Sequence, residues 1–399
     1  MSFSLPELGF VYWPIGTGDS ATVVVDAKNV VAQVDLRELE CCDDEGDCHA
    51  SIVDELVRLL PIRDKRPYLS TFILTHPDKD HIQGFEELLS KVTIGEIWHS
   101  PRVFMEYKKD LCEDAQKFVA EVDRRRKETI KNHGVVSSGD RVRVIGHADL
   151  FETPEYKNFP DYWRSFPGSS ITSLDGVDHT GVFEAFIHAP FKDDCDGDRN
   201  ESSLAFQIVL SSGNQVGKAL FLGDLCYPAI KRIFNKTKEK QRPQYLGWNV
   251  LLAPHHGSKS AMYWKDDPER DEVLKKDILA DLESAALEPS YLVVSSESDF
   301  SDDAGKNPPH LKARKRYEEI VDAGHFLCTH EHPNTSSPEP ICFCISAEGF
   351  TLRQSASTKR AEANTRLTAA VAQARGGGAP PKSQVGFGNL GQSMFWGEE

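Results

Sequence analysis

The segment His76–His81, which reads HPDKDH, is the feature that most constrains what this chain can fold into. It directly follows Ser70–Thr75, an apolar run typical of a buried β-strand, and precedes a helical pattern over about Ile82–Ser90. Four side chains of metal-binding type therefore fall within six residues at a strand-to-helix turn. A loop that only caps the helix through Asp80 would need one such side chain. The mixture of imidazole and carboxylate suits Zn²⁺, Mn²⁺ or iron.

Two later segments repeat the pattern of an apolar strand that ends in metal-binding side chains. Leu220–Leu222 runs into a Gly-Asp pair that ends at Asp224, and Leu251–Ala253 runs, after a proline, into His255 and His256. Alone, each signal is weak, because a Gly-Asp turn is common and a histidine pair is often only exposed. Together with HPDKDH they place Asp and His at the ends of three strands, which is what a dinuclear metal site requires.

The remaining segments predict strands and helices in two successive sets. Strands are predicted at Phe10–Tyr12, Ala21–Val25, Val30–Val34, Ser70–Thr75, Ile94–His99, Arg141–Ile145, Glu184–His188, Leu204–Leu210, Ala219–Leu222, Val250–Ala253, Tyr291–Ser295, Phe326–Thr329, Ile341–Ile345 and Phe350–Arg353. Helices are predicted at Ile52–Leu60, Ile82–Ser90, Glu106–Asn132, Glu272–Ala286 and Leu311–Ala323. This order predicts an α/β fold with two sheets sandwiched between helices. The aromatic, turn-rich residues 147–181 are predicted to be an insertion loop.

Composition and charge narrow the class of protein. The 399 residues carry a formal net charge of −16, and no apolar run approaches the ~18–20 residues that a membrane span needs. The amino terminus lacks the basic and long apolar regions of a secretory signal, and the nine cysteines include no CxxC pair, so we expect reduced thiols and a cytoplasmic protein. Cys41, Cys42, Cys48 and His49 are interpreted as a loop of free thiols rather than a Zn²⁺ site. The acidity argues against a general nucleic-acid binder, but it leaves room for an enzyme with a local basic groove.

The chain resembles the metallo-β-lactamase superfamily and, within it, the hydrolase domain of ComEC-type DNA-uptake proteins and their stand-alone relatives. The resemblance rests on the HxDxDH motif at 76–81, on the Gly-Asp pair at 223–224 and on HHGS at 255–258. Further matches follow in the family's order: the turn Gly16–Ser20, the strand end Val34-Asp35, the segment Asn200–Leu204, the strand Tyr291–Ser295 and His310. The match spans about residues 8–353.

The resemblance implies an αββα sandwich, in which two mixed β-sheets are flanked by helices, and a hydrolase that uses two divalent metal ions and metal-bound hydroxide. The expected ions are Mn²⁺ or Zn²⁺, with Mg²⁺ as a further candidate, because Asp78 stands where most of the superfamily has histidine and a carboxylate is the harder ligand. The superfamily's middle histidine ligand has no obvious counterpart. Asn200 stands near its place, and His188 is the less favoured substitute.

The resemblance also implies roles for individual residues. The implied metal ligands are His76, Asp78, Asp80, His81, Asp224 and His255. Asp80 with His81 would hold one ion, and His76 with Asp78 the other. The implied catalytic residues are Asp80, His256, His310 and Lys259, although Lys259 is as easily a solvated lysine at a helix start. Which of His255 and His256 completes the ligand set stays open.

These observations predict a metallohydrolase domain over residues 1–355 and, over 356–399, a helix and a flexible Gly- and Pro-rich tail. The aromatic end, residues 385–399, is either a disordered tail or a motif that docks on a protein partner. The favoured function is hydrolysis of phosphodiesters, with nucleic acid or a nucleotide as substrate and no membrane partner. The alternatives are hydrolysis of another ester, a lactone or an amide in the same fold, or a regulatory module recruited through its tail. The resemblance also allows a place in a bacterial defence system.

Overall fold

The computed structural model describes residues 3–39, 51–101, 111–192, 200–267, 269–303 and 306–355. The chain divides into two units, Met1–Arg353 and Gln354–Glu399, and all but two residues of the second lie outside the described ranges. The proposed boundary after residue 355, the cysteine-rich segment at 41–48 and the docking segment at 385–399 therefore stay predictions. Among the described residues, no helix has the length and apolar character needed to cross a bilayer.

A ten-stranded mixed sheet contains both ends of the first unit, in the order β21-β20-β1-β2-β3-β5-β6-β7-β8, with β4 pairing β5. Its strands are β1 (Gly9–Tyr12), β2 (Ala21–Asp26), β3 (Val30–Val34), β4 (Ile62–Arg63), β5 (Arg66–Ile73), β6 (Thr93–His99), β7 (Arg141–Ile145), β8 (Arg164–Ser165), β20 (Ile341–Ser346) and β21 (Gly349–Leu352). The helices that follow its strands are α1 (Ile52–Leu59), α2 (Lys79–Ile82), α3 (Phe85–Lys91) and α5 (Glu113–Lys131).

A second, seven-stranded mixed sheet runs in the order β19-β18-β15-β14-β13-β12-β9. Its strands are β9 (Ser170–Ile171), β12 (Phe183–Ala189), β13 (Ala205–Ser212), β14 (Gln215–Phe221), β15 (Trp248–Leu252), β18 (Ala286–Val294) and β19 (Phe326–Cys328). Its helices are α6 (Tyr227–Glu239), α7 (Lys276–Ala285) and α8 (Leu311–Tyr317). Two small hairpins lie outside both sheets: β10 (Ser173–Leu174) with β11 (Val177–Asp178), and β16 (Tyr263–Trp264) with β17 (Val273–Leu274).

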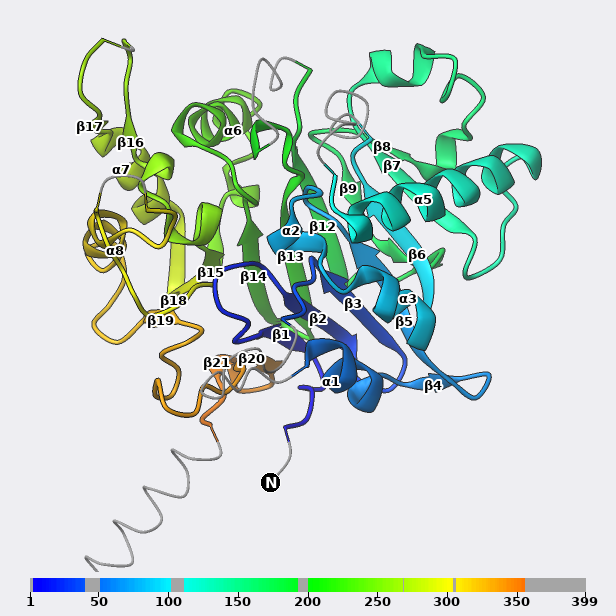
Figure 1. Cartoon of the computed structure of the whole chain (residues 1–399), viewed down its shortest axis with the longest axis horizontal. Helices are drawn as coiled ribbons and strands as arrows, with labels where there is room; N and C mark the ends of the chain where they lie inside the picture. The colour runs from blue at the N-terminus through cyan, green and yellow to red at the C-terminus, as the bar shows by residue number, and fades with distance from the viewer. Residues whose placement is uncertain are drawn as a thin grey trace, which may run out of the picture. The chain divides into compact units, whose positions relative to one another are not determined.

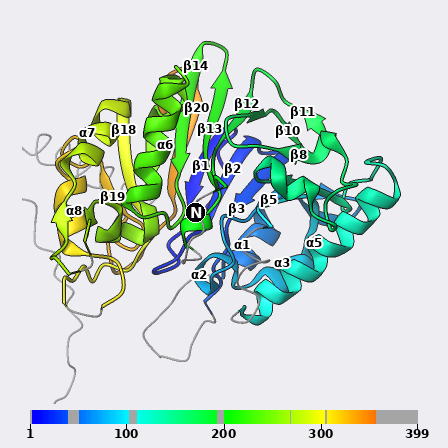
Figure 2. The ribbon, with the colours of Figure 1, turned by 90° about the horizontal axis from the view of Figure 1, so that it is seen from above.

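Three separate cores show how the layers are stacked. On β2, Val23 and Val25 point into a core between the two sheets, while Val24 points into a core that α1, α3 and α5 cover. On β14, Phe221 points between the sheets and Leu220 into a third core beneath α6, α7 and α8. Strands that are buried on both faces have continuous apolar sequences, which explains why apolar and polar residues do not alternate in these segments. The order helix, sheet, sheet, helix is visible in Figures 1 and 2, and the predicted αββα sandwich is confirmed.

Several predicted elements differ from the structure at their ends or in kind. The predicted helix Glu106–Asn132 begins at Glu113, and residues 102–110 lie outside the described ranges. The helix predicted from Glu272 begins at Lys276, because Val273 and Leu274 pair with β16. Residues 147–181 are not only loop: they contain β8, which extends the first sheet, β9, which extends the second, and two short 3₁₀ helices. Helix α6 was not predicted.

Candidate metal centre

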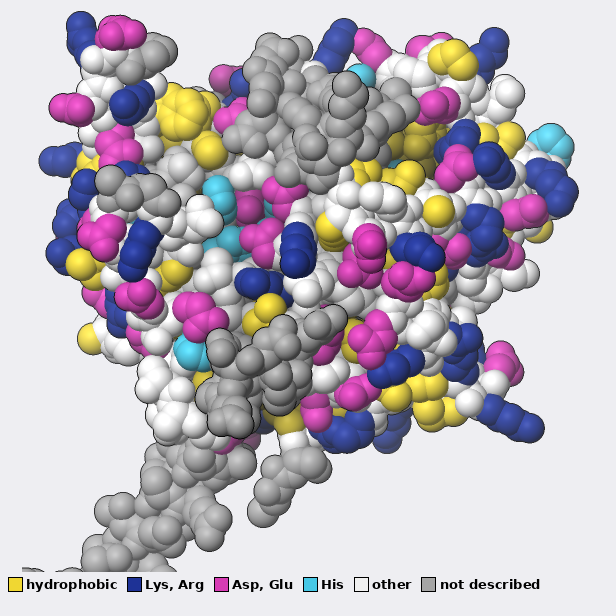
Figure 3. Space-filling model, viewed as in Figure 1, with side chains coloured by type: hydrophobic (Ala, Val, Ile, Leu, Met, Phe, Trp, Pro, Cys, Tyr) yellow, Lys and Arg dark blue, Asp and Glu magenta, His cyan; other side chains and the backbone are white. Residues whose placement is uncertain are grey.

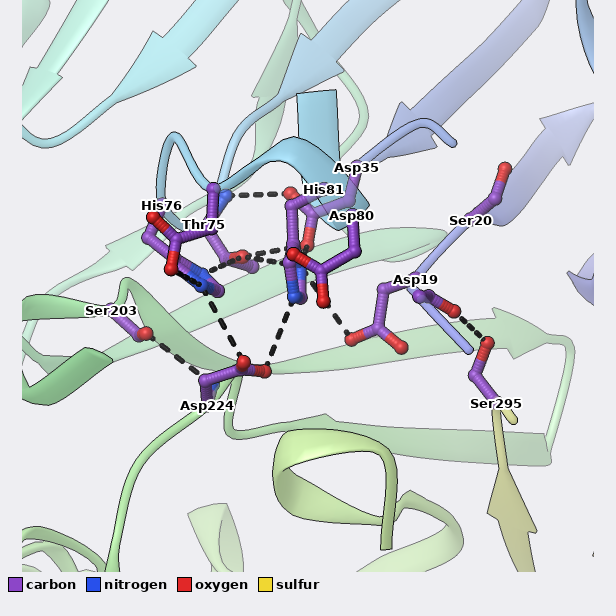
Figure 4. Close-up of polar contacts among 12 residues, drawn as sticks. Asp19, Ser20, Asp35, Thr75, His76, Asp80, His81, Ser203, Asp224 and Ser295 are labelled. Atoms are coloured by element: carbon purple, nitrogen blue, oxygen red, sulfur yellow. Dashed lines mark hydrogen bonds and ion pairs between the residues drawn. The ribbon is translucent and has the colours of Figure 1, made fainter. Parts of the chain in front are cut away.

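The ends of parallel strands bring the candidate ligands to one edge of each sheet. β3 runs parallel to β5, so that Asp35 and Thr75 follow neighbouring strand ends, and β14 runs parallel to β15, so that Asp224 and His255 do the same. Backbone hydrogen bonds then join the two edges, because Leu204 N donates to Thr75 O at 2.9 Å. Figure 4 shows the resulting cluster between the two sheets.

Backbone hydrogen bonds hold the HPDKDH turn in place. Asp78 is the cap residue of α2, and its carbonyl accepts a hydrogen bond from His81 N at 2.9 Å. The carbonyl of His81 accepts from Leu36 N at 2.8 Å, and that of Asp80 accepts from Asp19 N at 3.0 Å. Within the turn the side chains of His76 and His81 are buried, whereas Lys79 is exposed and Asp78 and Asp80 are partly exposed.

Asp224 is positioned by the segment that the resemblance matched at Asn200–Leu204. Gly223 has φ +53°, and a Cβ there would lie 2.8 Å from Ser203 Cβ, so this turn requires glycine. Asp224 N donates to Ser203 Oγ at 3.3 Å, and that hydroxyl donates to the carbonyl of Asn200 at 2.7 Å. Asn200 thus helps to fix Asp224 through its backbone.

His255 and His256 both adopt left-handed backbone conformations, with φ of 49° and 51°. Such angles are uncommon for histidine and cost backbone energy, which a fold retains mainly at functional sites. The turn is secured by His255 N, which donates to Gly223 O at 3.1 Å, and by Ser258 N, which donates to His255 O at 2.8 Å. As a result both rings reach Asp224.

One group of ligand atoms consists of Asp80, His81, Asp224 and His256. His256 Nε2 lies 3.2 Å from Asp80 Oδ2 and 3.1 Å from His81 Nε2, and His81 Nε2 lies 3.2 Å from Asp224 Oδ1. Ligands bound at ~2.0–2.2 Å around a tetrahedral ion are separated by about 3.3–3.6 Å. The measured separations of 3.1–3.2 Å lie just below this range, so these atoms could bind one divalent cation after small outward shifts.

A second group consists of His76, Asp78, Asp224 and His255. His76 Nε2 lies 3.6 Å from Asp224 Oδ2 and 3.8 Å from Asp78 Oδ2, and His255 Nε2 lies 3.6 Å from Asp224 Oδ2. These separations exceed hydrogen-bond length. His76 Nε2 is also buried without a hydrogen-bond partner among the described residues, which a metal ion would supply. The carboxylate of Asp224 is common to both groups.

Carboxylates on the outer side of the cluster orient the histidine rings. Asp35 accepts hydrogen bonds from Thr75 N at 2.7 Å, from Thr75 Oγ1 at 2.6 Å and from His81 Nδ1 at 2.9 Å. Asp19 Oδ1 lies 3.3 Å from His256 Nδ1. With Nδ1 bound to Asp35, Nε2 of His81 carries the lone pair that faces the cluster, as in metal-binding histidines, and Asp19 lies on the corresponding side of His256. Asp19 also comes within ligand range of His81, Asp224 and His256. It lies on the Nδ1 side of the two histidine rings.

The buried charges of the cluster shift the pKa values of its members. Burial raises the pKa of Asp224, but His81, His256 and His76 lower it well below its ordinary value. Burial lowers the pKa of His81, yet Asp224 and Asp35 raise it well above the usual range, and the pKa of His256 is raised to about 10 by Asp224 and Asp19. The carboxylate of Asp224 thus stays ionised and requires bound positive charge beside it, from protons or from metal ions.

The other predicted catalytic residues lie close together: Lys259 is on the turn that follows His256, and His310 is the cap residue at the start of α8. Lys259 N donates to His310 Nδ1 at 3.3 Å, and Lys259 Nζ lies 2.7 Å from Glu272 Oε1. Both side chains line a cavity of about 310 Å³ beside the cluster. His188, by contrast, is a buried structural residue: its Nε2 donates to Tyr245 O at 2.9 Å, and burial lowers its pKa to about 4.

Sequence reasoning assigned no role to several residues that the structure brings to the cluster. Asp19, Asp35 and Ser203 were matched only as parts of family segments, and Arg37 was not considered. The stem of Arg37 packs against Gly18, where a Cβ would lie 2.4 Å from Arg37 Cδ. Figure 3 shows histidine and acidic side chains reaching the surface together, with basic side chains beside them. Because the side chains of Asp78, Asp80 and His255 are 22%, 36% and 24% exposed, solvent reaches one side of the cluster.

Comparison with known proteins finds a remote likeness in structure alone. No protein-family model and no curated protein sequence matches the chain. The metallo-β-lactamase fold protein YhfI from Bacillus subtilis is 11% identical, with a TM-score of 0.38 over 84% of this chain and 98% of that one. The class B3 di-zinc metallo-β-lactamase LRA-12, from an Alaskan soil metagenome, is 12% identical, with a TM-score of 0.32 over 71% of this chain and 91% of that one. GOB-18 from Elizabethkingia meningoseptica, also a metallo-β-lactamase, is 12% identical, with a TM-score of 0.31 over 71% and 90%. Likeness at this level assigns no function.

Proposed function

We propose that this chain is a metal-dependent phosphodiesterase of the metallo-β-lactamase superfamily, related to its ComEC-type branch, that acts on nucleic acid or a nucleotide. One observation carries the proposal: two groups of closely spaced ligand atoms meet at the single, buried carboxylate of Asp224. The sequence motifs at 76–81, 223–224 and 255–258 support the superfamily, since they lie in the order that the resemblance requires.

The donor set suits hard or borderline divalent ions. Three carboxylates (Asp78, Asp80 and Asp224) and four imidazoles (His76, His81, His255 and His256) surround the two positions. We propose Mn²⁺ or Zn²⁺ as the resident ions, with Mg²⁺ as a further candidate. When bound, such ions polarise a phosphoryl oxygen and lower the pKa of a bound water.

The chain's own residues would orient the substrate and move protons. His310 Nδ1 accepts from Lys259 N, so the neutral ring carries its proton on Nε2, and burial together with Lys259 lowers its pKa. A neutral His310 can donate a hydrogen bond from Nε2 to a phosphoryl oxygen, and only after taking up a second proton can the ring protonate a leaving oxygen. Asp35 and Asp19 hold the rings of His81 and His256, so that these histidines need not reorganise during the reaction.

The distribution of charge favours a small substrate or one delivered by a protein. The whole chain carries −16, which repels a long polyanion. Lys259, Lys265 and His310 nevertheless line the cavity beside the cluster, and they offer an anion local compensation.

The test is hydrolysis of bis(p-nitrophenyl) phosphate, plasmid, single-stranded DNA, RNA and cyclic dinucleotides with Mn²⁺, Zn²⁺ or Mg²⁺. We expect turnover that Asp224→Asn lowers at least about 100-fold, because Asp224 serves both ligand groups. Asp281→Asn, which alters only an ion pair with Lys231 and Lys238 on α6, is the matched control and should retain activity. Turnover of lactones or other esters without any phosphodiester would refute the substrate class. No turnover with any metal, together with a partner bound through residues 385–399, would favour a regulatory module.

A further inference from the structure

The cavity beside the cluster is built by the turn that carries the paired histidines and by the hairpin that follows it. It holds about 310 Å³ and is lined by Ser258, Lys259, Ser260, Tyr263, Trp264, Lys265, Glu272 and His310. This volume lies at the lower end of the range for small-ligand sites, about 300–1,000 Å³, and so suits one small molecule rather than a folded polymer.

Backbone hydrogen bonds make the cavity continuous with the metal centre. Ser258 N donates to His255 O at 2.8 Å, and His310 N donates to Gly257 O at 3.1 Å. Lys259 N then donates to His310 Nδ1 at 3.3 Å. A group bound between Lys259 and His310 would therefore lie next to the residues that surround Asp224.

The polar groups on this wall suit a phosphate. Lys259 Nζ is held by Glu272 Oε1 at 2.7 Å, and Lys312 Nζ reaches the same carboxylate at 3.8 Å, so Glu272 is balanced by two lysines. Lys265 is exposed on the rim, and His310 presents a neutral ring. Cations and a neutral donor on one side of the cavity can bind phosphate oxygens.

Two aromatic residues of the hairpin also line the cavity. Tyr263 and Trp264 form β16 and pair with Leu274 and Val273 of β17. The Tyr263 ring packs on the helix-covered core of the second sheet, with Lys312 Nζ 5.8 Å from its centroid. Trp264 is half-buried and follows it on the strand, so the hairpin presents an indole at the cavity.

We propose that this cavity is a nucleotide subsite, in which Trp264 stacks on the nucleobase while Lys259 and His310 bind the adjoining phosphate. This inference rests on the proposed phosphodiesterase function and adds the substrate class. An aromatic face next to cationic side chains is the combination that recognises single nucleotides without reading their sequence. The hairpin between the histidine turn and α7 thereby gains a role in specificity.

The test compares two diesters with the same leaving group: thymidine 5′-(p-nitrophenyl phosphate), which has a base, and bis(p-nitrophenyl) phosphate, which has none. We expect the Mn²⁺-loaded protein to favour the thymidine ester in kcat/KM. Trp264→Ala should reduce this preference about tenfold, through KM, and Trp264→Phe should fall in between. Tyr162→Ala, which removes an exposed aromatic ring in a different cavity, is the control and should keep the preference.

A second readout needs neither metal nor turnover. In chelator, AMP should bind the protein more tightly than ribose 5-phosphate, and Trp264→Ala should remove most of that difference. If the wild type cleaves both diesters and Trp264→Ala leaves their ratio unchanged, the subsite is refuted while the proposed function stands. If neither diester is cleaved with any metal, the proposed function fails, and the AMP comparison decides the subsite by itself.

Discussion

Replacing Asp35 by asparagine should weaken metal binding at the centre without removing any of the proposed ligands. Oδ1 of Asp35 accepts from Thr75 N, and Oδ2 accepts from Thr75 Oγ1 and from His81 Nδ1 at 2.9 Å. An asparagine that keeps the bond to Thr75 N turns its NH₂ group towards His81 Nδ1. That nitrogen must then become an acceptor, so the proton of the neutral ring moves to Nε2. A protonated Nε2 cannot bind a metal ion.

The magnitude follows from the cost of the wrong tautomer. Loss of a carboxylate that orients a ligating histidine lowers metal affinity about 10–100-fold, which corresponds to about 1.4–2.8 kcal/mol. Asp35 is fully buried, so solvent cannot replace the lost acceptor. We therefore expect the upper part of this range for Asp35→Asn.

The assay is the Kd for Mn²⁺ and Zn²⁺, measured by competition with a chelator. The matched control is Asp26→Asn, which removes the same charge. Asp26 is the last residue of β2 and lies at the end of the β2–β3 pair that is away from Asp35. An Asp35→Asn protein that folds, gives the far-ultraviolet spectrum of the wild type and binds both metals with unchanged Kd would refute the reasoning.

Two further predictions concern a glycine and a histidine. Gly18→Ala would place a Cβ 2.7 Å from the carbonyl of Asp80 and 2.4 Å from Arg37 Cδ, so metal affinity should fall at least about tenfold. Gly139→Ala, which meets no atom within 4 Å, should cost only about 1 kcal/mol of stability through its positive φ, and equal metal affinity in the two variants would contradict the argument. For His188, burial lowers the pKa to about 4, so below about pH 6.5 the unfolded chain binds a proton that the folded chain does not. The free energy of unfolding should therefore fall by about 1.4 kcal/mol per pH unit from pH 6.5 towards 4, and a His188→Gln protein with the same slope would be evidence against it.

The ligand segments could be predicted because their information is local. HPDKDH, the Gly-Asp pair and the paired histidines each follow an apolar strand, and parallel strand ends converge whatever the loops between them do. The layers could be predicted because strands and helices recur in two successive sets, which indicates two sheets between helices, and because the resemblance implies the αββα arrangement.

What could not be predicted depends on contacts between distant segments. Asp35 orients His81 across 46 positions, and only the pairing of β3 with β5 brings them together. The choice between His255 and His256 could not be made, because the left-handed backbone at both residues lets both rings reach Asp224. The sequence placed Asn200 near the position of the missing histidine ligand. In the structure the His255 ring lies beside Oδ2 of Asp224, and the backbone carbonyl of Asn200 helps to position Asp224 through Ser203.

Anomalous scattering from a crystal soaked in Mn²⁺ tests the central claim most directly. Two peaks that share Asp224 as a ligand are expected. One should lie among Asp80, His81 and His256, and the other among His76, Asp78 and His255. A single peak elsewhere in the fold, or these side chains turned away from one another with no peak between them, would contradict it.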